Sequence, residues 1–349
     1  MSKPYAFGAA VLLSACATVT PPVEAQNTPV TAAVDSARAG QPLAGRPEVR
    51  AFVREMVERH GFDAATLDRT FARARTRPEI IEAMDRPAEA KPWSAYRKIF
   101  LTEKRIQGGV DFMRANAAAL AAAQTRYGVP PEFVTAIIGV ETLYGGNTGK
   151  YAVFEALATL AFDYPRRADY FRKELEQFLL LVRDEGIDPL QPKGSYAGAM
   201  GLAQFMPSSY RKLAIDFDGD GHRNLWSDPD DAIGSVANYL AASGWKRSDP
   251  LVAVPARAEG AAWPNLVSSN FRQPKSLTRL SVNDWGTRGV RPLAAVDGGR
   301  GALLLQLDGE AGPETWLAFD NFYAITRYNL SALYAMAVYQ LGDEIRRRL

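Results

Sequence analysis

The sequence contains a single cysteine and almost no excess charge. Cys16 is the only cysteine among 349 residues, so no intramolecular disulfide can form. The formal net charge of +2 argues against nucleic acid as the main partner, because phosphate binding usually needs a basic surface. Hydrophobic residues make up 47% of the chain, which is enough for a sizeable core, and a length of 349 residues is enough for two or three domains.

The hydrophobic run near the N-terminus, residues 6–15, is too short to span a bilayer as a helix. It follows Lys3 and ends in Leu13-Ser14-Ala15-Cys16, which resembles the lipobox of bacterial lipoproteins. We interpret residues 1–16 as a lipoprotein signal peptide and Cys16 as the lipidation site. An ordinary secretory signal with an incidental cysteine is the alternative. The residue after Cys16 is Ala17 and not aspartate, which in Gram-negative lipoproteins favours the outer membrane. We therefore expect a periplasmic protein that is anchored by its lipid to the outer membrane.

Residues 17–45 contain no aromatic residue and are rich in proline, alanine and threonine. Such a segment cannot bury enough apolar surface to order itself. We expect a flexible tether that, at about 3.3 Å per residue, reaches on the order of 100 Å when extended. An anchored protein with this tether could act at a distance from the membrane.

The remaining chain predicts an α+β fold that is mainly α. Residues 46–246 carry helical hydrophobic spacing, and we expect helices at 47–60, 64–75, 102–127, from 131 onward and at 166–184. Residues 247–318 contain short β-prone runs between glycines and prolines, which predict a small β-rich domain. Residues 319–349 return to helix, and we expect this C-terminal segment to pack on the helical body.

One carboxylate, Glu141, ends an apolar run that begins at Phe133 and is interrupted only by Thr135 and Gly139. An acid in an apolar wall is disfavoured as the ion, so its pKa rises. It can then donate a proton to a leaving oxygen, as the general acid of glycoside cleavage does. A glutamate that reaches water at a helix end, or that makes a core hydrogen bond, is the alternative.

The segment from Gly194 to Tyr210, "GSYAGAMGLAQFMPSSY", is rich in glycine and alanine. These small residues let a backbone or a ligand approach closely. Gln204 lies among apolar neighbours and needs hydrogen-bond partners, which a sugar amide or hydroxyl could provide. A tight helix crossing with a structural glutamine is the alternative.

Six motifs occur in order along the chain: "GVETLYG", "YPRRADYF", "GSYAGAMGLAQFMPSSY", "DFDGDGHRNLW", "IGSVANYL" and "NFYAITRYNLSALYAMAVYQLG". Together they resemble the membrane-bound lytic murein transglycosylase B family of the lysozyme-like superfamily. The resemblance covers roughly residues 45–349. It implies a lysozyme-like helical catalytic core with an additional helical domain and a small β-rich domain.

The resemblance also implies an activity. Members cleave the β-1,4 bond between N-acetylmuramic acid and N-acetylglucosamine in peptidoglycan without water, leaving a 1,6-anhydro end. Glu141 would act first as acid and then as base, so no second carboxylate is needed. Hydrolases normally need one, and the sequence leaves Asp163 and Asp184 open for that role. The expected partners are glycan strands and stem peptides, with no nucleic acid and no organic cofactor.

Other site residues carry over by position from the resemblance. Ser195 and Gln204 correspond to residues near the catalytic glutamate, and Arg166 and Arg167 to residues that meet the acidic stem peptide. The saccharide groove would be lined by tyrosines, namely Tyr96, Tyr239, Tyr328 and Tyr334. Ala203 departs from the glycine common in the family, which puts the fine shape of the pocket in doubt. Core packing of each tyrosine and a solvated helix start for the arginines are the alternatives.

The stretch "DFDGDGHRNLWSDPDD", residues 216–231, has the spacing of an EF-hand loop. Its first half supplies Asp216, Asp218 and Asp220, the turn residue Gly221 and the main-chain carbonyl of His222. Ser227 stands at position 12, where a glutamate is expected, so the closing acid comes later, at Asp230 or Asp231. We favour Asp231 because it directly precedes the next predicted helix.

Oxygen ligands alone favour Ca²⁺, which would stiffen the loop without a part in the chemistry. A surface turn without metal is the alternative. The loop agrees with the extended EF-hand-like site of the family, and we give His222 no role as a catalytic base.

Three other functions stay open at this point. A muramidase would hydrolyse the same bond, and a peptidoglycan-binding lipoprotein with an inactive site would not need Glu141. A calcium sensor is the weakest interpretation, because the irregular loop lacks a partner loop. No heptad pattern indicates a dimer, so we expect a monomer.

Overall fold

The computed structural model describes residues 42–85, 91–249 and 251–349. The described residues form two compact units. The helical unit comprises described residues 42–85 and 148–212, and the mixed unit comprises described residues 91–147 and 213–349. The predicted signal peptide, Cys16 and nearly all of the predicted tether lie outside the described residues.

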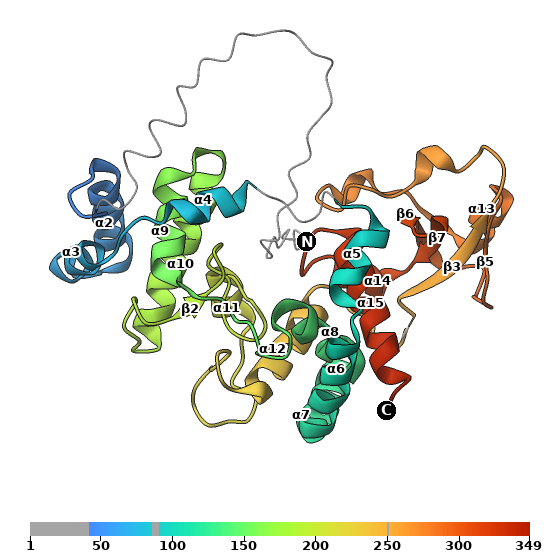
Figure 1. Ribbon diagram of the computed structural model, residues 1–349, viewed down its shortest axis with the longest axis horizontal. Coiled ribbons are helices and arrows are strands. Elements are labelled where there is room, and N and C mark those ends of the chain that lie inside the picture. The colour runs from blue at the N-terminus through green and yellow to red at the C-terminus, as the bar shows by residue number, and fades with distance from the viewer. Residues whose placement is uncertain (1–41, 86–90, 250) are drawn as a thin grey trace, which may run out of the picture. The chain divides into compact units, whose positions relative to one another are not determined.

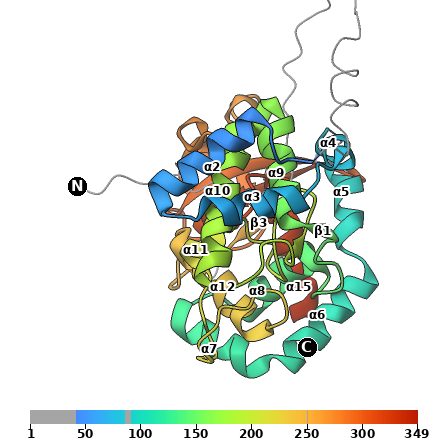
Figure 2. The same ribbon diagram turned by 90° about the vertical axis from the view of Figure 1, so that its left-hand side faces the viewer.

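The helical unit is built around α9 and α10, and α2 and α3 lie beside them in both ribbon views (Figures 1 and 2). Its helices are α2 (Pro47–His60), α3 (Ala64–Arg73), α4 (Pro78–Met84), α9 (Val153–Asp163), the 3₁₀ helix η2 (Pro165–Arg167), α10 (Ala168–Asp184) and α11 (Pro207–Leu213). A short antiparallel pair joins β1 (Tyr151–Ala152) to β2 (Lys193–Gly194). Phenylalanine rings fill the interior, with Phe71 and Phe154 5.0 Å apart between ring centroids.

Local signals set the ends of α2 as predicted. Pro47 occupies the first turn, where its missing N–H has no partner to lose. Gly61 ends the helix at φ 67°, in the left-handed conformation that glycine adopts without strain. Val49, Phe52, Val53 and Met56 form the buried face.

The mixed unit contains Glu141 and all of the larger sheet. Its helices are α5 (Trp93–Phe100), α6 (Glu103–Ala115), α7 (Ala117–Tyr127), α8 (Pro131–Thr142), α12 (Pro229–Ala242), η3 (Pro264–Leu266), η4 (Pro274–Ser276), α13 (Val282–Thr287), α14 (Asp320–Ile325) and α15 (Ala332–Arg346).

The prediction of a single helix from Thr102 to Gly128 is wrong, because the helix is interrupted at Asn116. The side-chain amide of Asn116 donates to the carbonyl of Phe112 at 2.8 Å. Asparagine competes in this way with the helical backbone, and the helix restarts as α7.

The sheet has five antiparallel strands in the order β4-β6-β7-β3-β5. The strands are β3 (Ala253–Ala258), β4 (Arg279–Ser281), β5 (Val290–Pro292), β6 (Gly301–Gly309) and β7 (Gly312–Ala318). On one face of the sheet, Val254, Leu304 and Leu317 form a core cluster with the buried ring of Trp285 from α13. The sheet lies beside α15, where the ring of Trp316 on β7 is 6.2 Å from that of Tyr339 (Figure 1).

The C-terminal helix α15 packs against α8, α6 and α5. Gly342 permits the close approach to α8, because a Cβ at this position would lie 3.2 Å from the carbonyl oxygen of Glu132. The last predicted segment therefore returns to the helices of its own unit, and it brings Tyr334 beside Glu141.

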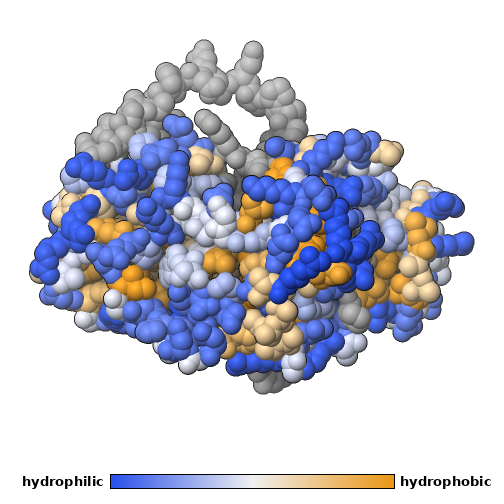
Figure 3. Space-filling model, turned by 60° about the horizontal axis from the view of Figure 1, so that its bottom comes forward, coloured by the Kyte–Doolittle hydropathy of each residue, from blue (hydrophilic) through white to orange (hydrophobic). Residues whose placement is uncertain are grey.

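The observed structure is mainly helical with a small antiparallel sheet, which confirms the fold class. The predicted domain boundaries, including those after residues 246 and 318, remain predictions. None of the described helices is both long and apolar enough to cross a membrane. On the face drawn in Figure 3, hydrophobic residues occupy separate areas among hydrophilic ones.

Candidate active site

Glu141 lies one residue before the end of α8, after a run of buried residues from Phe133 to Val140. The helix ends because Leu143 and Tyr144 both adopt positive φ angles, 52° and 59°. Such angles are strained for side chains of this size, so the surrounding structure must hold the turn in place.

Tyr144 supplies that support by folding back over its own helix. A Cβ added to Gly139 would lie 2.5 Å from the Tyr144 hydroxyl, so only glycine leaves room for the ring. The hydroxyl donates to the carbonyl of Arg105 at 2.8 Å, and Arg105 Nε donates to the carbonyl of Gly139 at 2.9 Å. These contacts fix the end of α8 and thereby the position of Glu141.

We predict that Gly139→Ala destabilises the protein by about 1–3 kcal/mol, because the new methyl group overlaps the Tyr144 ring. Urea unfolding of the variant beside the wild type measures this difference. The control is Gly286→Ala, since a Cβ at this helical position has no neighbour within 4 Å. Equal stability of both variants would contradict this account of the turn.

Three tyrosines from separate parts of the mixed unit gather at Glu141. The hydroxyl of Tyr334, on α15, donates to Glu141 Oε1 at 2.6 Å. The Tyr328 ring stacks on that of Tyr334 with centroids 6.3 Å apart, and Tyr239 from α12 lies 4.6 Å from Tyr328. The Tyr239 hydroxyl donates to the carbonyl of Arg327 at 2.6 Å. All three tyrosines are buried, while Glu141 remains partly exposed.

This environment determines the protonation of Glu141. Desolvation around the carboxyl raises its pKa to about 7, and the hydrogen bond from Tyr334 lowers it by a smaller amount. Burial also raises the pKa of Tyr334 and Tyr328, and the nearby Glu141 carboxyl adds to this effect. Both phenols therefore stay protonated when Glu141 ionises.

Tyr96 lies on α5 of the same unit and is buried. Its ring lies 5.1 Å from that of Phe100 and 6.4 Å from that of Trp93. Tyr96 also contributes to the raised pKa of Tyr334, so it belongs to the same aromatic neighbourhood.

Ser195 and Gln204 belong to the helical unit, where both organise the glycine-rich segment. Ser195 Oγ accepts from the N–H of Ala199 at 3.0 Å. Gln204 has a positive φ of 49°, and its side-chain amide donates to the carbonyls of Thr148 and Gly201 at 3.1 and 2.9 Å. These hydrogen bonds favour the alternative interpretation, in which Gln204 has a structural role.

Arg166 and Arg167 lie in η2, also in the helical unit. Arg166 donates to Asp85 at 2.6 Å, yet its side chain stays mostly exposed. The Arg167 guanidinium lies 4.6 Å from the ring centroid of Tyr170. Stacking on an aromatic face orients a guanidinium.

The two other carboxylates considered for catalysis are engaged in ion pairs within the helical unit. Asp163 is buried and pairs with Arg46. Asp184 pairs with Arg183 and Arg211, each at 3.3 Å. A catalytic nucleophile or base would have to give up these contacts, so the structure does not favour either for a hydrolytic role.

The acidic loop of residues 216–231 lies in the mixed unit and gathers carboxylates into two overlapping groups. Oxygen atoms of Asp216, Asp218 and Asp231 lie within 4.8 Å of one another, as do those of Asp218, Asp220 and Asp228. Asp231 is fully buried, and its oxygens accept from the N–H groups of Phe217 at 2.7 Å and Asn224 at 2.6 Å.

Carboxylates this close repel one another unless a cation lies between them, so the donor set fits a hard divalent ion such as Ca²⁺. Asp228, which also caps α12, was missed by the sequence analysis. Its side chain accepts from the N–H groups of Asp230 and Asp231 at the start of α12, and it belongs to the second carboxylate group. The N–H of His222 donates to Asp220 at 2.8 Å.

Comparison with known proteins shows which family the chain belongs to. The family model described as "Transglycosylase SLT domain" matches residues 44–343. The chain belongs to this family. It is 44% identical to the membrane-bound lytic murein transglycosylase B of Escherichia coli (strain K12), over 96% of this chain and 95% of that protein. The protein is therefore an enzyme, a transglycosylase. The family resemblance predicted from the six motifs is confirmed.

Two solved structures are similar to this transglycosylase over most of its length. The Escherichia coli lytic transglycosylase Slt35 in complex with calcium is 45% identical with a TM-score of 0.80, over 89% of this chain and 96% of that one. SltB3 from Pseudomonas aeruginosa in complex with NAG-anhNAM-pentapeptide is 34% identical with a TM-score of 0.75, over 86% of this chain and 79% of that one. These similarities confirm the lysozyme-like fold class.

Proposed function

We propose that this transglycosylase cleaves the β-1,4 bond between N-acetylmuramic acid and N-acetylglucosamine in peptidoglycan, with Glu141 as its single acid and base. The observation that carries the proposal is the carboxyl of Glu141, with its pKa near 7 and its hydrogen bond from Tyr334. An acid with this pKa can be protonated before the reaction and ionised during it.

In the first step Glu141 protonates the glycosidic oxygen, and the bond from that oxygen to C1 of the muramic acid breaks. The 6-hydroxyl oxygen of the same sugar then forms a bond to C1, and its proton passes to the Glu141 carboxylate. The carboxyl is regenerated, no water is consumed and the product carries a 1,6-anhydro ring. The 2-N-acetyl group of the sugar can assist at C1, so the protein needs no nucleophile.

The aromatic neighbours of Glu141 fit a saccharide groove. The rings of these tyrosines are almost wholly buried, so in this proposal they form the wall of the groove around Glu141. We assign Tyr96, Tyr239, Tyr328 and Tyr334 to this groove. As a separate assignment, we propose that Ser195 and Gln204 bind sugar. We assign Arg166 and Arg167 to the acidic stem peptide, because a guanidinium can hold a carboxylate by two hydrogen bonds.

The proposal extends to a structural calcium ion and to a lipid anchor. Asp216, Asp218, Asp220, Asp231 and the carbonyl of His222 would hold Ca²⁺, with Asp228 as a further ligand. The ion would stiffen the loop before α12, the helix that carries Tyr239. Cys16 would attach the enzyme to the outer membrane from the periplasmic side, and we propose a monomer.

The pH dependence of cleavage follows from the carboxyl of Glu141. Because the protonated form acts first, we expect kcat/KM to fall as the pH rises above about 7. Tyr334→Phe removes the donor that favours the carboxylate, so the pKa of Glu141 rises and the alkaline limb moves to higher pH. Tyr239→Phe is the control, since this hydroxyl binds a main-chain carbonyl. A limb that moves to lower pH in Tyr334→Phe would contradict this assignment.

Digestion of purified peptidoglycan tests the proposed function. Anhydro products are about 18 Da lighter than the products of hydrolysis, because no water is added. We expect the lighter muropeptides from the enzyme that lacks residues 1–16. The heavier products alone would make the protein a muramidase, and no products at all would favour a binding lipoprotein.

A further inference from the structure

A groove with a volume of about 740 Å³ runs along α10 in the helical unit. Glu55 and Arg59 of α2 line one side, residues of α10 between 169 and 177 form the floor, and Ser208 contributes from α11. The volume lies within the range of small-molecule sites. Nearly every side chain that lines it is charged or polar, which excludes a purely apolar ligand.

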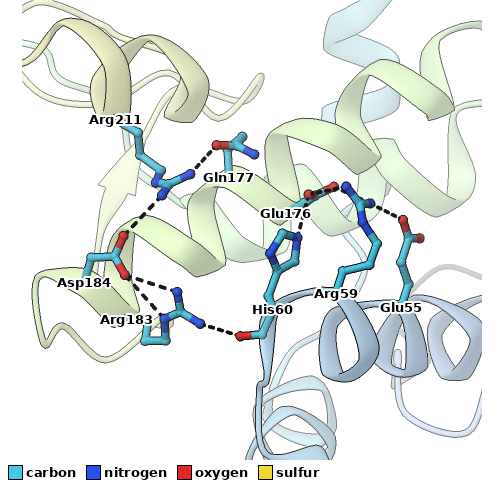
Figure 4. Close-up of polar contacts among 8 residues, drawn as sticks. All are labelled: Glu55, Arg59, His60, Glu176, Gln177, Arg183, Asp184 and Arg211. Carbon is cyan, nitrogen blue, oxygen red and sulfur yellow. Dashed lines mark hydrogen bonds and ion pairs between the residues drawn. The ribbon is translucent and has the colours of Figure 1, made fainter.

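Most charges of the groove already have partners, which hold its walls in place (Figure 4). Arg59 pairs with Glu55 and with Glu176, and Glu176 also binds His60 Nε2 at 2.8 Å. Glu174 accepts from the N–H and the hydroxyl of Ser208 at 2.9 and 2.7 Å. These groups cannot easily rearrange to neutralise other charges.

Three charged side chains of α10 remain in the groove without a hydrogen bond or an ion pair to any described residue, namely Asp169, Arg172 and Lys173. The Arg172 guanidinium lies 5.9 Å from the ring centroid of Phe162, and its Nε is buried without a hydrogen-bond partner. Arg172 as a whole is only partly buried, so the terminal N–H groups of its guanidinium can reach a ligand in the groove.

The spacing of these three residues indicates which charged groups a ligand of the groove would carry. Asp169 lies three residues before Arg172 and four before Lys173, so the side chains emerge one helical turn apart on neighbouring faces. One anion and two cations at this separation complement a group with an ammonium and a carboxylate close together.

We propose that this groove binds the zwitterionic end of a peptidoglycan stem peptide, the diaminopimelate side chain, whose ammonium and carboxylate share one carbon. Arg172 and Lys173 hold the carboxylate, and Asp169 holds the ammonium. The inference rests on the proposed function for its ligand, and it adds a peptide site that recognises the chemistry of the third residue. A stem peptide with lysine as its third residue lacks this carboxylate and binds the groove more weakly.

Calorimetric titration of the full chain with two synthetic tripeptides tests the proposal. The probes are L-Ala-γ-D-Glu-meso-diaminopimelate and the same tripeptide with L-lysine. We expect the diaminopimelate peptide to bind at least about 10-fold more tightly, and Arg172→Gln and Asp169→Asn each to remove about 10-fold of its affinity. Arg50→Gln is the matched control, because Arg50 is an exposed cation of α2 away from the groove.

Equal affinities for the two tripeptides, or an unchanged affinity in both groove variants, would overturn the proposal. So would the absence of binding by an enzyme that cleaves peptidoglycan. Asp169 is exposed, so Asp169→Asn still tests the site if Arg172→Gln fails to fold. Because binding is measured without turnover, an inactive protein that binds the peptide contradicts the proposed activity and leaves this site intact.

Discussion

Replacement of Glu141 by glutamine is expected to reduce cleavage of peptidoglycan by roughly 1,000-fold or more, since general acid–base catalysis contributes on this scale. Glutamine keeps the shape of the side chain and can still accept the hydrogen bond from Tyr334. It can neither donate a proton to the glycosidic oxygen nor accept one from the 6-hydroxyl. The rate of muropeptide release from purified peptidoglycan measures the effect.

The control is the free energy of unfolding of Glu141→Gln, which should not fall below that of the wild type. The pKa of Glu141 is raised to about 7 in the folded state, so the folded state binds its proton more tightly than the unfolded state does. The wild type therefore loses stability as the pH rises from about 4.5 to 7, by up to about 3 kcal/mol. Glu141→Gln lacks this loss and should be the more stable protein at pH 8. A folded variant with near-normal activity would remove Glu141 from the mechanism.

Replacement of Asp231 by alanine is expected to produce the largest loss of stability in the acidic loop. Its buried carboxylate accepts from two main-chain N–H groups, and both would be left without these bonds. We expect the free energy of unfolding to fall by roughly 3 kcal/mol in urea. We also expect calcium to stabilise the wild type and not the variant, because the ligand set is incomplete.

The neighbouring substitution Asp230→Ala provides the control, since Asp230 belongs to neither of the two carboxylate groups. It should retain stabilisation by calcium, which a chelator then removes. If Asp230→Ala abolished the calcium effect while Asp231→Ala kept it, the closing acid of the loop would be the other aspartate. An unchanged wild type on addition of calcium would leave the loop as a surface turn.

Local signals in the sequence predicted the elements that depend on local physics. Pro47, Gly61 and Pro131 mark helix ends through their backbone preferences, and the structure follows them. The break at Asn116 was missed because the alanine-rich stretch after it continues the helical pattern. What decided there was a single side-chain hydrogen bond to the backbone, which competes with helix propensity by a small margin.

The candidate site was only partly predictable. An acid at the end of an apolar run made Glu141 a candidate, because desolvation of a carboxyl follows from its neighbours in the chain. The run alone left a non-catalytic glutamate as the favoured alternative, and the catalytic role came from the further motifs and the resemblance. Tyr334 lies 193 residues away, and no spacing rule connects the two. Its place at the site came from the resemblance, as did those of Tyr239 and Tyr328. The support that Tyr144 and Arg105 give to the end of α8 required the structure.

Digestion of peptidoglycan in water enriched in heavy oxygen tests the central claim most directly. The proposed reaction closes the ring with the 6-hydroxyl of the sugar, so mass spectrometry should find no heavy oxygen at the new muramic acid ends. Heavy oxygen incorporated at C1 of every new end would show that water attacks the sugar. That result would contradict the anhydro-forming reaction and make Glu141 one of two catalytic carboxylates.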